Sequence, residues 1–84
     1  MSVKAGVNRE TIERLVLLNE TTRALANELA QAHHGLDVGS AWSVIKAAER
    51  ASSAAEDLWI AACTLAARVD ADPEAMRAAL RRGS

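Results

Sequence analysis

Hydrophobic residues recur at every third and fourth position along the second half of the chain, over residues 41–69. This spacing places them on one side of an α-helix and is typical of a helix that packs along another helix. Because most of these positions hold alanine, a partner helix can approach closely. The sequence therefore predicts a long helix over 41–69. Its apolar column consists of Ala41, Val44, Ala48, Ala51, Ala55, Leu58, Ala62, Leu65 and Val69.

A second column with the same spacing predicts an earlier helix over 9–34. Asn8 stands where an N-cap is expected, because its side chain can accept a hydrogen bond from the first turn. Gly35 follows the column and suits the left-handed residue that ends many helices. The members of this column are Thr11, Leu15, Leu18, Thr22, Leu25, Leu29 and Ala32.

A short connection over 35–40 joins the two predicted helices, so we expect them to lie antiparallel and side by side. Either Ser40 or Asp37 can cap the second helix, because both side chains accept hydrogen bonds from backbone N–H groups. The two helices are similar in length, as a hairpin requires. The sequence therefore predicts a long antiparallel helical hairpin.

Asp72 and Pro73 predict the start of a short third helix over 73–82. Proline suits the first helical position, where an N–H group would have no partner within the helix. Residues 1–7 show no periodicity and are expected to form a flexible tail. The chain is thus predicted to be a single all-α domain over 1–84, a three-helix bundle that is either monomeric or completed by dimerisation.

Two stretches, 15–18 and 58–63, are apolar on every side of their helices. In an antiparallel hairpin, a residue of the first helix lies at the same height as a residue of the second helix when their two numbers have a fixed sum, which the connection sets at about 75. Both stretches then lie at the same height, near the open end of the hairpin. The third helix offers few large side chains there, so we expect a second copy of the chain or another protein to cover the rest. The residues predicted for this interface are Leu15, Val16, Leu17, Leu18, Leu58, Trp59 and Ile60.

The composition points in the same direction. The chain has 84 residues and is 50% hydrophobic, but much of that share is alanine, and Phe and Tyr are absent. A chain this short buries little core by itself, which favours a homodimer. The formal net charge of -1, with both signs interspersed, argues against non-specific binding to nucleic acid or membranes. A lone cysteine, with no signal segment or membrane span in the sequence, leads us to expect a cytoplasmic protein.

No residue set has the spacing of a catalytic, metal or cofactor site. His33 and His34 are adjacent, so on a helix they point about 100° apart and do not chelate one ion. Cys63 has no base near it in the expected register and is interpreted as a packing or partly exposed thiol. The acidic residues of the second helix alternate with basic ones, which is typical of a solvated face. We therefore predict a protein without enzymatic activity or cofactor.

Two features keep alternatives open. Trp42 lies beside the connection and either packs on Leu36 and Val38 or anchors an interface, a role that tryptophan often fills. The third helix carries the only basic cluster, which either stabilises the helix C-terminus or contacts an anion such as nucleic acid. The members of this cluster are Arg77, Arg81 and Arg82.

The function expected from these features is protein–protein interaction through a helical apolar face. Such a protein would be a small regulator, adaptor or inhibitor. Short, neutral, alanine-rich helical chains are common among phage and mobile-element inhibitors of host complexes, which is a likeness of class alone. The alternatives are a nucleic-acid-associated regulator that uses the arginine cluster and, with less support, a small helical enzyme.

Overall fold

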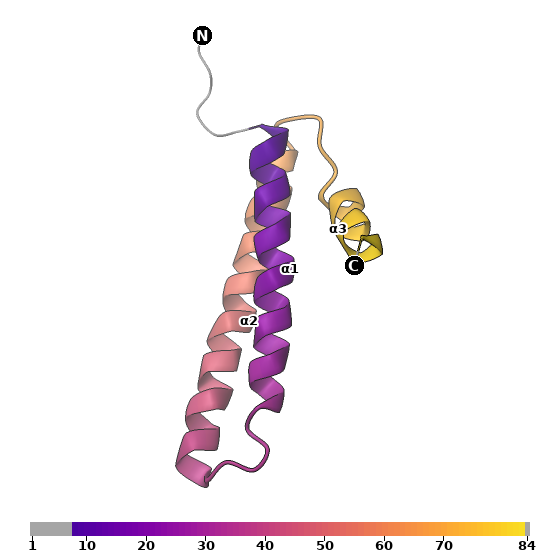
Figure 1. The fold of residues 1–84 in the computed structure, drawn as a ribbon. Helices are drawn as coiled ribbons and strands as arrows, with labels where there is room; N and C mark the ends of the chain where they lie inside the picture. Colours follow the sequence, from indigo (N-terminus) through magenta and orange to yellow (C-terminus); the bar gives the residue numbers. More distant parts are fainter. Residues whose placement is uncertain (1–7, 84) are drawn as a thin grey trace.

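The computed structural model describes residues 8–83; the tail expected over 1–7 lies outside them. Its elements are α1 (Arg9–Gln31), α2 (Val38–Ala66) and α3 (Pro73–Arg82). Helices α1 and α2 run antiparallel along each other, and α3 lies against one side of this pair, nearer to α1 than to α2 (Figure 1). The predicted all-α fold, a long helical hairpin followed by a short helix, is confirmed.

The ends of the long helices differ from their predictions. Helix α1 ends at Gln31 instead of residue 34, and a turn over 32–35 follows, in which Gly35 has a φ of 86°. Helix α2 covers Val38–Ala66 instead of 41–69. Of the two candidate caps, Asp37 is the one used, since its Oδ1 accepts a 2.8 Å hydrogen bond from the Ser40 N–H group.

The other caps agree with the sequence. The Thr11 N–H group donates to Oδ1 of Asn8 over 2.8 Å at the start of α1. At the start of α3, Oδ1 of Asp72 accepts from two backbone N–H groups, and Pro73 occupies the first helical position. Helix α3 has the predicted bounds 73–82. Side-chain caps therefore fix where each of the three described helices begins.

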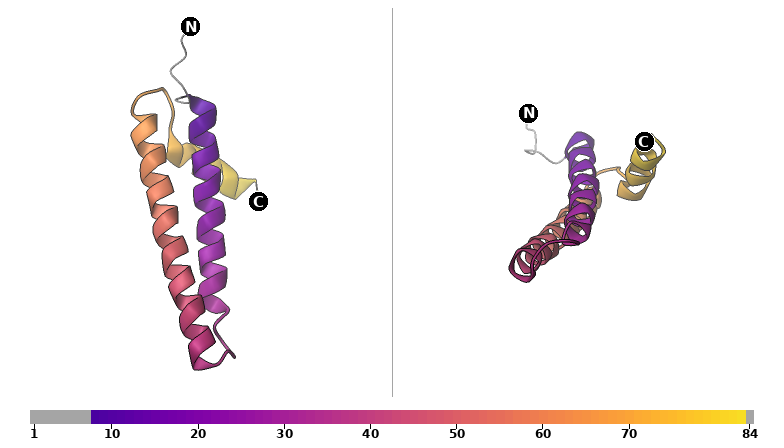
Figure 2. Two further views of the ribbon diagram at one scale, coloured as in Figure 1. Left: turned by 90° about the vertical axis from the view of Figure 1, so that its left-hand side faces the viewer. Right: turned by 60° about the horizontal axis from the view of Figure 1, so that its bottom comes forward.

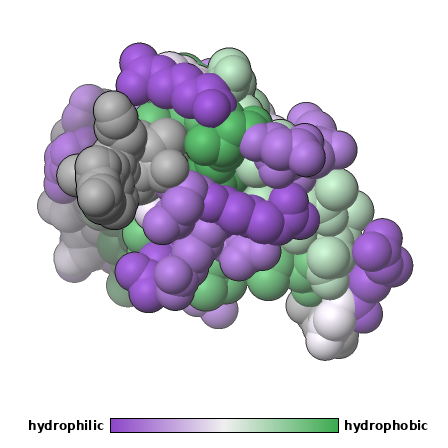
Figure 3. Space-filling model, turned by 90° about the horizontal axis from the view of Figure 1, so that it is seen from above, coloured by the Kyte–Doolittle hydropathy of each residue, from purple (hydrophilic) through white to green (hydrophobic). Residues whose placement is uncertain are grey.

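The hydrophobic core lies near the open end of the hairpin, where α3 packs. Its buried residues come from all three helices, and larger side chains such as Leu15 and Trp59 pack around them, partly buried. Seen from above, hydrophobic atoms lie between the polar side chains that surround this end (Figure 3). The buried members of the core are Ile12, Val16, Ala62, Ala66 and Met76.

The buried column of α1 is not the predicted one. The sequence predicted a column through Leu18 and Leu25, but each of these leucines keeps 51% of its surface exposed. The column that is buried instead consists of Ile12, Val16, Asn19 and Ala26. On α2 the alanine prediction holds, because Ala48, Ala55 and Ala62 are buried against α1. Helix α1 is thus rotated about its axis by one residue, or about 100°, from the predicted orientation. This rotation turns its leucines away from the centre of the hairpin.

Candidate interaction surfaces of the hairpin

The hairpin has two broad sides, and α3 covers part of one of them. Figure 2, left, looks onto the opposite side, and α3 lies behind the two long helices in this view. We call the first the α3 side and the second the leucine face. They differ in the chemistry of their side chains.

A cluster of polar side chains, centred on Arg77, joins α3 to the hairpin on the α3 side. The Arg77 guanidinium lies 3.5 Å from the centre of the Trp59 ring. Its Nη2 donates a 3.0 Å hydrogen bond to Oδ1 of Asn19. Asn19 is itself buried, and its Nδ2 donates to the carbonyl oxygen of Ala55 over 2.6 Å. One guanidinium thus connects all three helices.

Glu20 holds the same region by charge. Its Oε2 accepts a 2.9 Å hydrogen bond from Nε of Arg81, and its Oε1 lies 3.8 Å from Nε of Arg77. The Arg77 side chain keeps only 14% of its surface exposed, so its charge is largely removed from water. Charges in such a setting are stable only when paired. Two of the three arginines of the predicted basic cluster therefore hold the fold together, and Arg82 alone of the cluster lacks such a role among the described contacts.

The part of the α3 side next to the Arg77 cluster is polar as well. Beyond α3, a pocket between α1 and α2 continues from the Arg77 cluster and has polar and charged side chains along both walls. These side chains are well suited to contact water. The residues added to the cluster by this pocket are Arg23, Asn27, Ser52 and Glu56.

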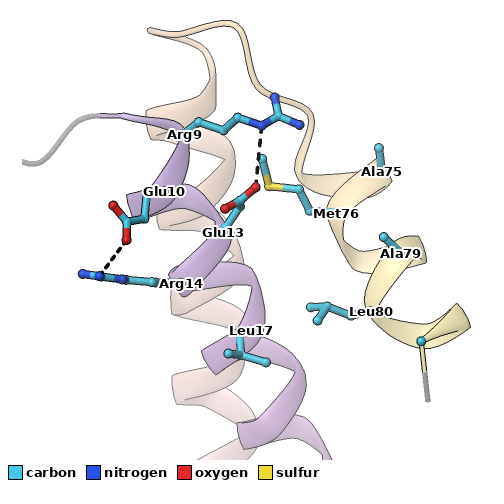
Figure 4. A pocket seen from close by; sticks show the side chains of 10 residues that line it. Arg9, Glu10, Glu13, Arg14, Leu17, Ala75, Met76, Ala79 and Leu80 are labelled. Atoms are coloured by element: carbon cyan, nitrogen blue, oxygen red, sulfur yellow. Dashed lines mark hydrogen bonds and ion pairs between the residues drawn. The ribbon is translucent and has the colours of Figure 1, made fainter.

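A shallow groove runs between α1 and α3. Figure 4 shows Leu17 on α1 and Leu80 on α3 at its floor, with charged side chains along the α1 wall. These charges are already paired within α1, because Glu10 contacts Arg14 over 2.8 Å and Glu13 contacts Arg9 over 3.6 Å. The groove therefore combines charges that have partners with an apolar floor, which is formed by Leu17, Ala75, Met76, Ala79 and Leu80.

The leucine face is formed by residues that repeat every seven positions along both long helices. Leu18 and Leu25 lie on one side of α1 by this spacing, and Leu18 points about 200° away from Glu20, which contacts α3. None of the residues of this face is buried, and none carries a charge. The leucine face consists of Leu15, Leu18, Thr22, Leu25 and Leu29 of α1 with Ala47, Ala51, Ala54, Leu58, Ala61 and Leu65 of α2.

The structure separates the residues that the sequence predicted for one interface. Val16 is buried in the core, and Trp59 is half-buried beneath Arg77, so α3 covers part of the apolar stretches. Leu17 lines the groove beside α3. The leucine face brings together the three remaining members on its side, which are Leu15, Leu18 and Leu58.

Ile60 and Trp42 lie on neither face. They are exposed on the outer side of α2, eighteen residues and therefore five helical turns apart. Trp42 was expected either to pack on Leu36 and Val38 or to anchor an interface. All three side chains are exposed in the structure. The amino group of Lys46 instead lies 5.4 Å from the centre of the Trp42 ring.

Four members of these surfaces were not predicted as such from the sequence: Asn19, Glu20, Leu25 and Leu29. A polar residue in an apolar column, such as Asn19, was the available signal for a buried hydrogen-bonded side chain. The leucines were visible in the sequence, but they were assigned to the seam between α1 and α2.

The described residues contain neither a cluster of metal-ligating side chains nor a helix that could span a membrane. Within residues 8–83 no group of three or more His, Cys, Asp and Glu side chains could hold a metal ion. His33 and His34 lie in the turn after α1 with their rings in edge contact. None of the described helices combines the length and the apolar character needed to cross a membrane. Comparisons with known proteins found no match to a family model, a curated protein or a solved structure.

Proposed function

We propose that this protein is a non-enzymatic interaction module that binds another protein chain through the leucine face. The observation that supports this is the exposure of Leu18 and Leu25, large apolar side chains on a face without charges. At 1.5 Å per residue, the α2 stripe of the face extends over about 27 Å, from residue 47 to residue 65, and the α1 stripe over about 21 Å, from residue 15 to residue 29. They are about 20 Å wide, because packed helices lie about 10 Å apart.

These dimensions give an apolar patch of roughly 500 Å², which is near the upper end of the range for monomeric proteins. A patch of this size usually marks an interaction surface, and its two antiparallel helices, side by side, match the way a helical face receives another helix. When bound to its target through this face, the protein would occlude the target or bridge it to another molecule, as a small regulator, adaptor or inhibitor does. We propose the reducing cytoplasm as its location, which agrees with a free, exposed Cys63.

The α3 side supports this choice by contrast. Arg77 and Arg81 are engaged by Glu20, so the arginine cluster is not an open basic patch. Recognition of nucleic acid needs such cations to be free for phosphate contacts. The leucine face is therefore better suited than the α3 side to bind a partner.

Site-specific photo-crosslinking tests it. A photoreactive phenylalanine derivative is placed at Leu25, and in a matched variant at Ser53, which is exposed on the outer side of α2. In cell extract, the Leu25 variant should form discrete adducts with a protein chain, whether a second copy or another protein. The Ser53 variant should form none. Equal labelling at both positions, or no adduct at Leu25, would contradict the proposal.

A further inference from the structure

We infer that the partner of the leucine face is a second copy of this chain, with the closed ends of the two hairpins together. This inference rests on the proposed function and adds the identity and orientation of the partner. It would make a two-fold symmetric bundle in which each α1 lies over the α2 of the other copy, with antiparallel neighbours throughout.

The sizes of the side chains support this arrangement. The α1 stripe of the face contains leucines, whereas the α2 stripe contains mainly alanines. When α1 of one copy lies over α2 of the other, Leu25 is level with residue 49 and meets Ala47 and Ala51, and Leu18 is level with residue 56, beside Ala54. Both helix pairs can then approach equally closely, as in knobs-into-holes packing. Turning one copy end for end would place α1 on α1, leucine against leucine, and α2 on α2, alanine against alanine. The two helix pairs would then pack at unequal distances.

The register of the hairpin makes the contacts specific. The hydrogen bond from Asn19 to the carbonyl of Ala55 shows that residues are level when their numbers sum to about 74. A two-fold axis parallel to the helices keeps every residue at its own height, so the copies cannot slide. Leu18 of one copy is then level with residue 56 of the other, between Ala54 and Leu58.

Charges at the edges of the face agree with this register. Glu28 is level with residue 46, so Arg50 of the other copy lies about one turn away along the shared edge. Arg14 and Asp57 lie within a turn of each other by the same rule, and their charges are also opposite. Within one chain Glu28 and Arg50 stand on opposite edges of the hairpin, so only a second copy can bring them together.

The area that such a dimer buries predicts its strength. Two faces of roughly 500 Å² each give about 1,000 Å² in total, which is the lower limit for a specific interface. We therefore expect reversible dimerisation that depends on protein concentration. Light scattering across a wide concentration range should show a transition from the mass of one chain to that of two.

Variants test the face. Leu25→Glu should weaken dimerisation at least a hundredfold, and Ala54→Leu should weaken it by filling the row of small residues. Ser53→Glu, a substitution next to Ala54 on the outer side of α2, should leave it unchanged. Circular dichroism of dilute samples checks that each variant keeps the helical content of the original chain. If folded Leu25→Glu protein dimerises as well as Ser53→Glu protein, the face is not the interface.

A charge reversal tests the orientation. Glu28→Arg should weaken dimerisation severalfold, and adding Arg50→Glu should restore it, whereas adding Arg14→Glu should restore it only if the copies run end to end. Spin labels on Ser40→Cys, with Cys63→Ser, report the same orientation. Labels at the closed ends should lie near each other, far closer than the length of α2, about 43 Å. Rescue by Arg14→Glu, or a label separation near 43 Å or greater, overturns the orientation.

The outcome also separates this inference from the proposed function. If the purified chain is monomeric at every concentration, self-association is wrong. Adducts of Leu25 with a different protein in extract would then leave the interaction function standing. Loss of both the dimer and the Leu25 adducts would remove the inference and the proposed function together.

Discussion

The two sides of the hairpin are built from the same pair of helices, yet they bind their neighbours by different chemistry. On the α3 side, a short helix is held by a guanidinium that contacts Trp59 and Asn19 and lies beside Glu20. On the leucine face, Leu18, Leu25 and Ala54 are exposed and the other leucines and alanines are half-buried, and no described element covers this face (Figure 2).

This difference separates a contact within the chain from a surface suited to a second chain. A polar contact such as that of Arg77 needs every partner in one geometry, because an unpaired buried charge costs several kcal/mol. Apolar contact is less directional and roughly proportional to area. A short helix joined to the hairpin meets the first demand easily, whereas a face of repeated leucines can receive a separate partner.

The largest difference in stability should come from truncating one apolar side chain in the core and one on the leucine face. Ile12→Ala should lower the free energy of unfolding by about 3 kcal/mol, since a fully buried side chain leaves a cavity. Leu25→Ala removes a half-exposed side chain and should cost about 1 kcal/mol or less. Urea unfolding at concentrations where the chain is monomeric measures both. Equal losses would show that the leucine face is covered in the monomer.

A smaller effect should follow when the polar contact of the α3 side is broken. Arg77→Ala should cost about 2 kcal/mol, because it removes the stacking on Trp59 and a hydrogen bond to a buried amide. Arg82→Ala, in the same helix, is the matched control. Fluorescence of Trp59 in a Trp42→Phe background reports whether α3 stays docked. An Arg77→Ala variant with unchanged emission and stability would show that α3 is held by Met76 and its apolar neighbours alone.

The smallest effect should be a pH dependence at the closed end, outside both faces. The N–H group of Ser40 holds the pKa of Asp37 below its ordinary value of 3.8, because the hydrogen bond favours the carboxylate. The folded state thus binds this proton less readily than the unfolded state. The contribution of Asp37 is complete above about pH 4 and is lost as the pH falls through the lower folded pKa.

Asp37→Asn should remove this part of the acid sensitivity while it keeps most of the cap at neutral pH, since asparagine also caps helices. Unfolding curves at several pH values between 2 and 6 measure the difference between the two proteins. Identical pH profiles would show that the carboxylate of Asp37 gives no stability beyond that of a neutral cap.

The fold was predictable from the sequence, because spacing, caps and one proline define helices locally. Asn8, Asp72 and Pro73 each act where the pattern indicated. The bounds of α2 were less certain, since Asp37 and Ser40 both suit a cap and only the folded backbone selects between them. The alanine column of α2 also faces α1 as predicted.

The arrangement of side chains around α1 was not predictable in the same way. Periodicity assigns large leucines to the seam and a polar residue to the outside, so Asn19 hid the column that is buried. Whether a buried amide is tolerated depends on partners that are far away in the sequence, here Ala55 and Arg77. The pairing of Glu20 with Arg81 has the same long-range origin.

The short connection over 67–72 has a consequence for how firmly α3 must bind. A link of this length keeps an undocked helix close to its site, at an effective concentration in the millimolar range. Docking that would be too weak to detect between separate molecules then suffices to keep α3 in place most of the time. Cutting the chain within 67–72 should therefore release α3 as a peptide that rebinds the hairpin only at high concentration.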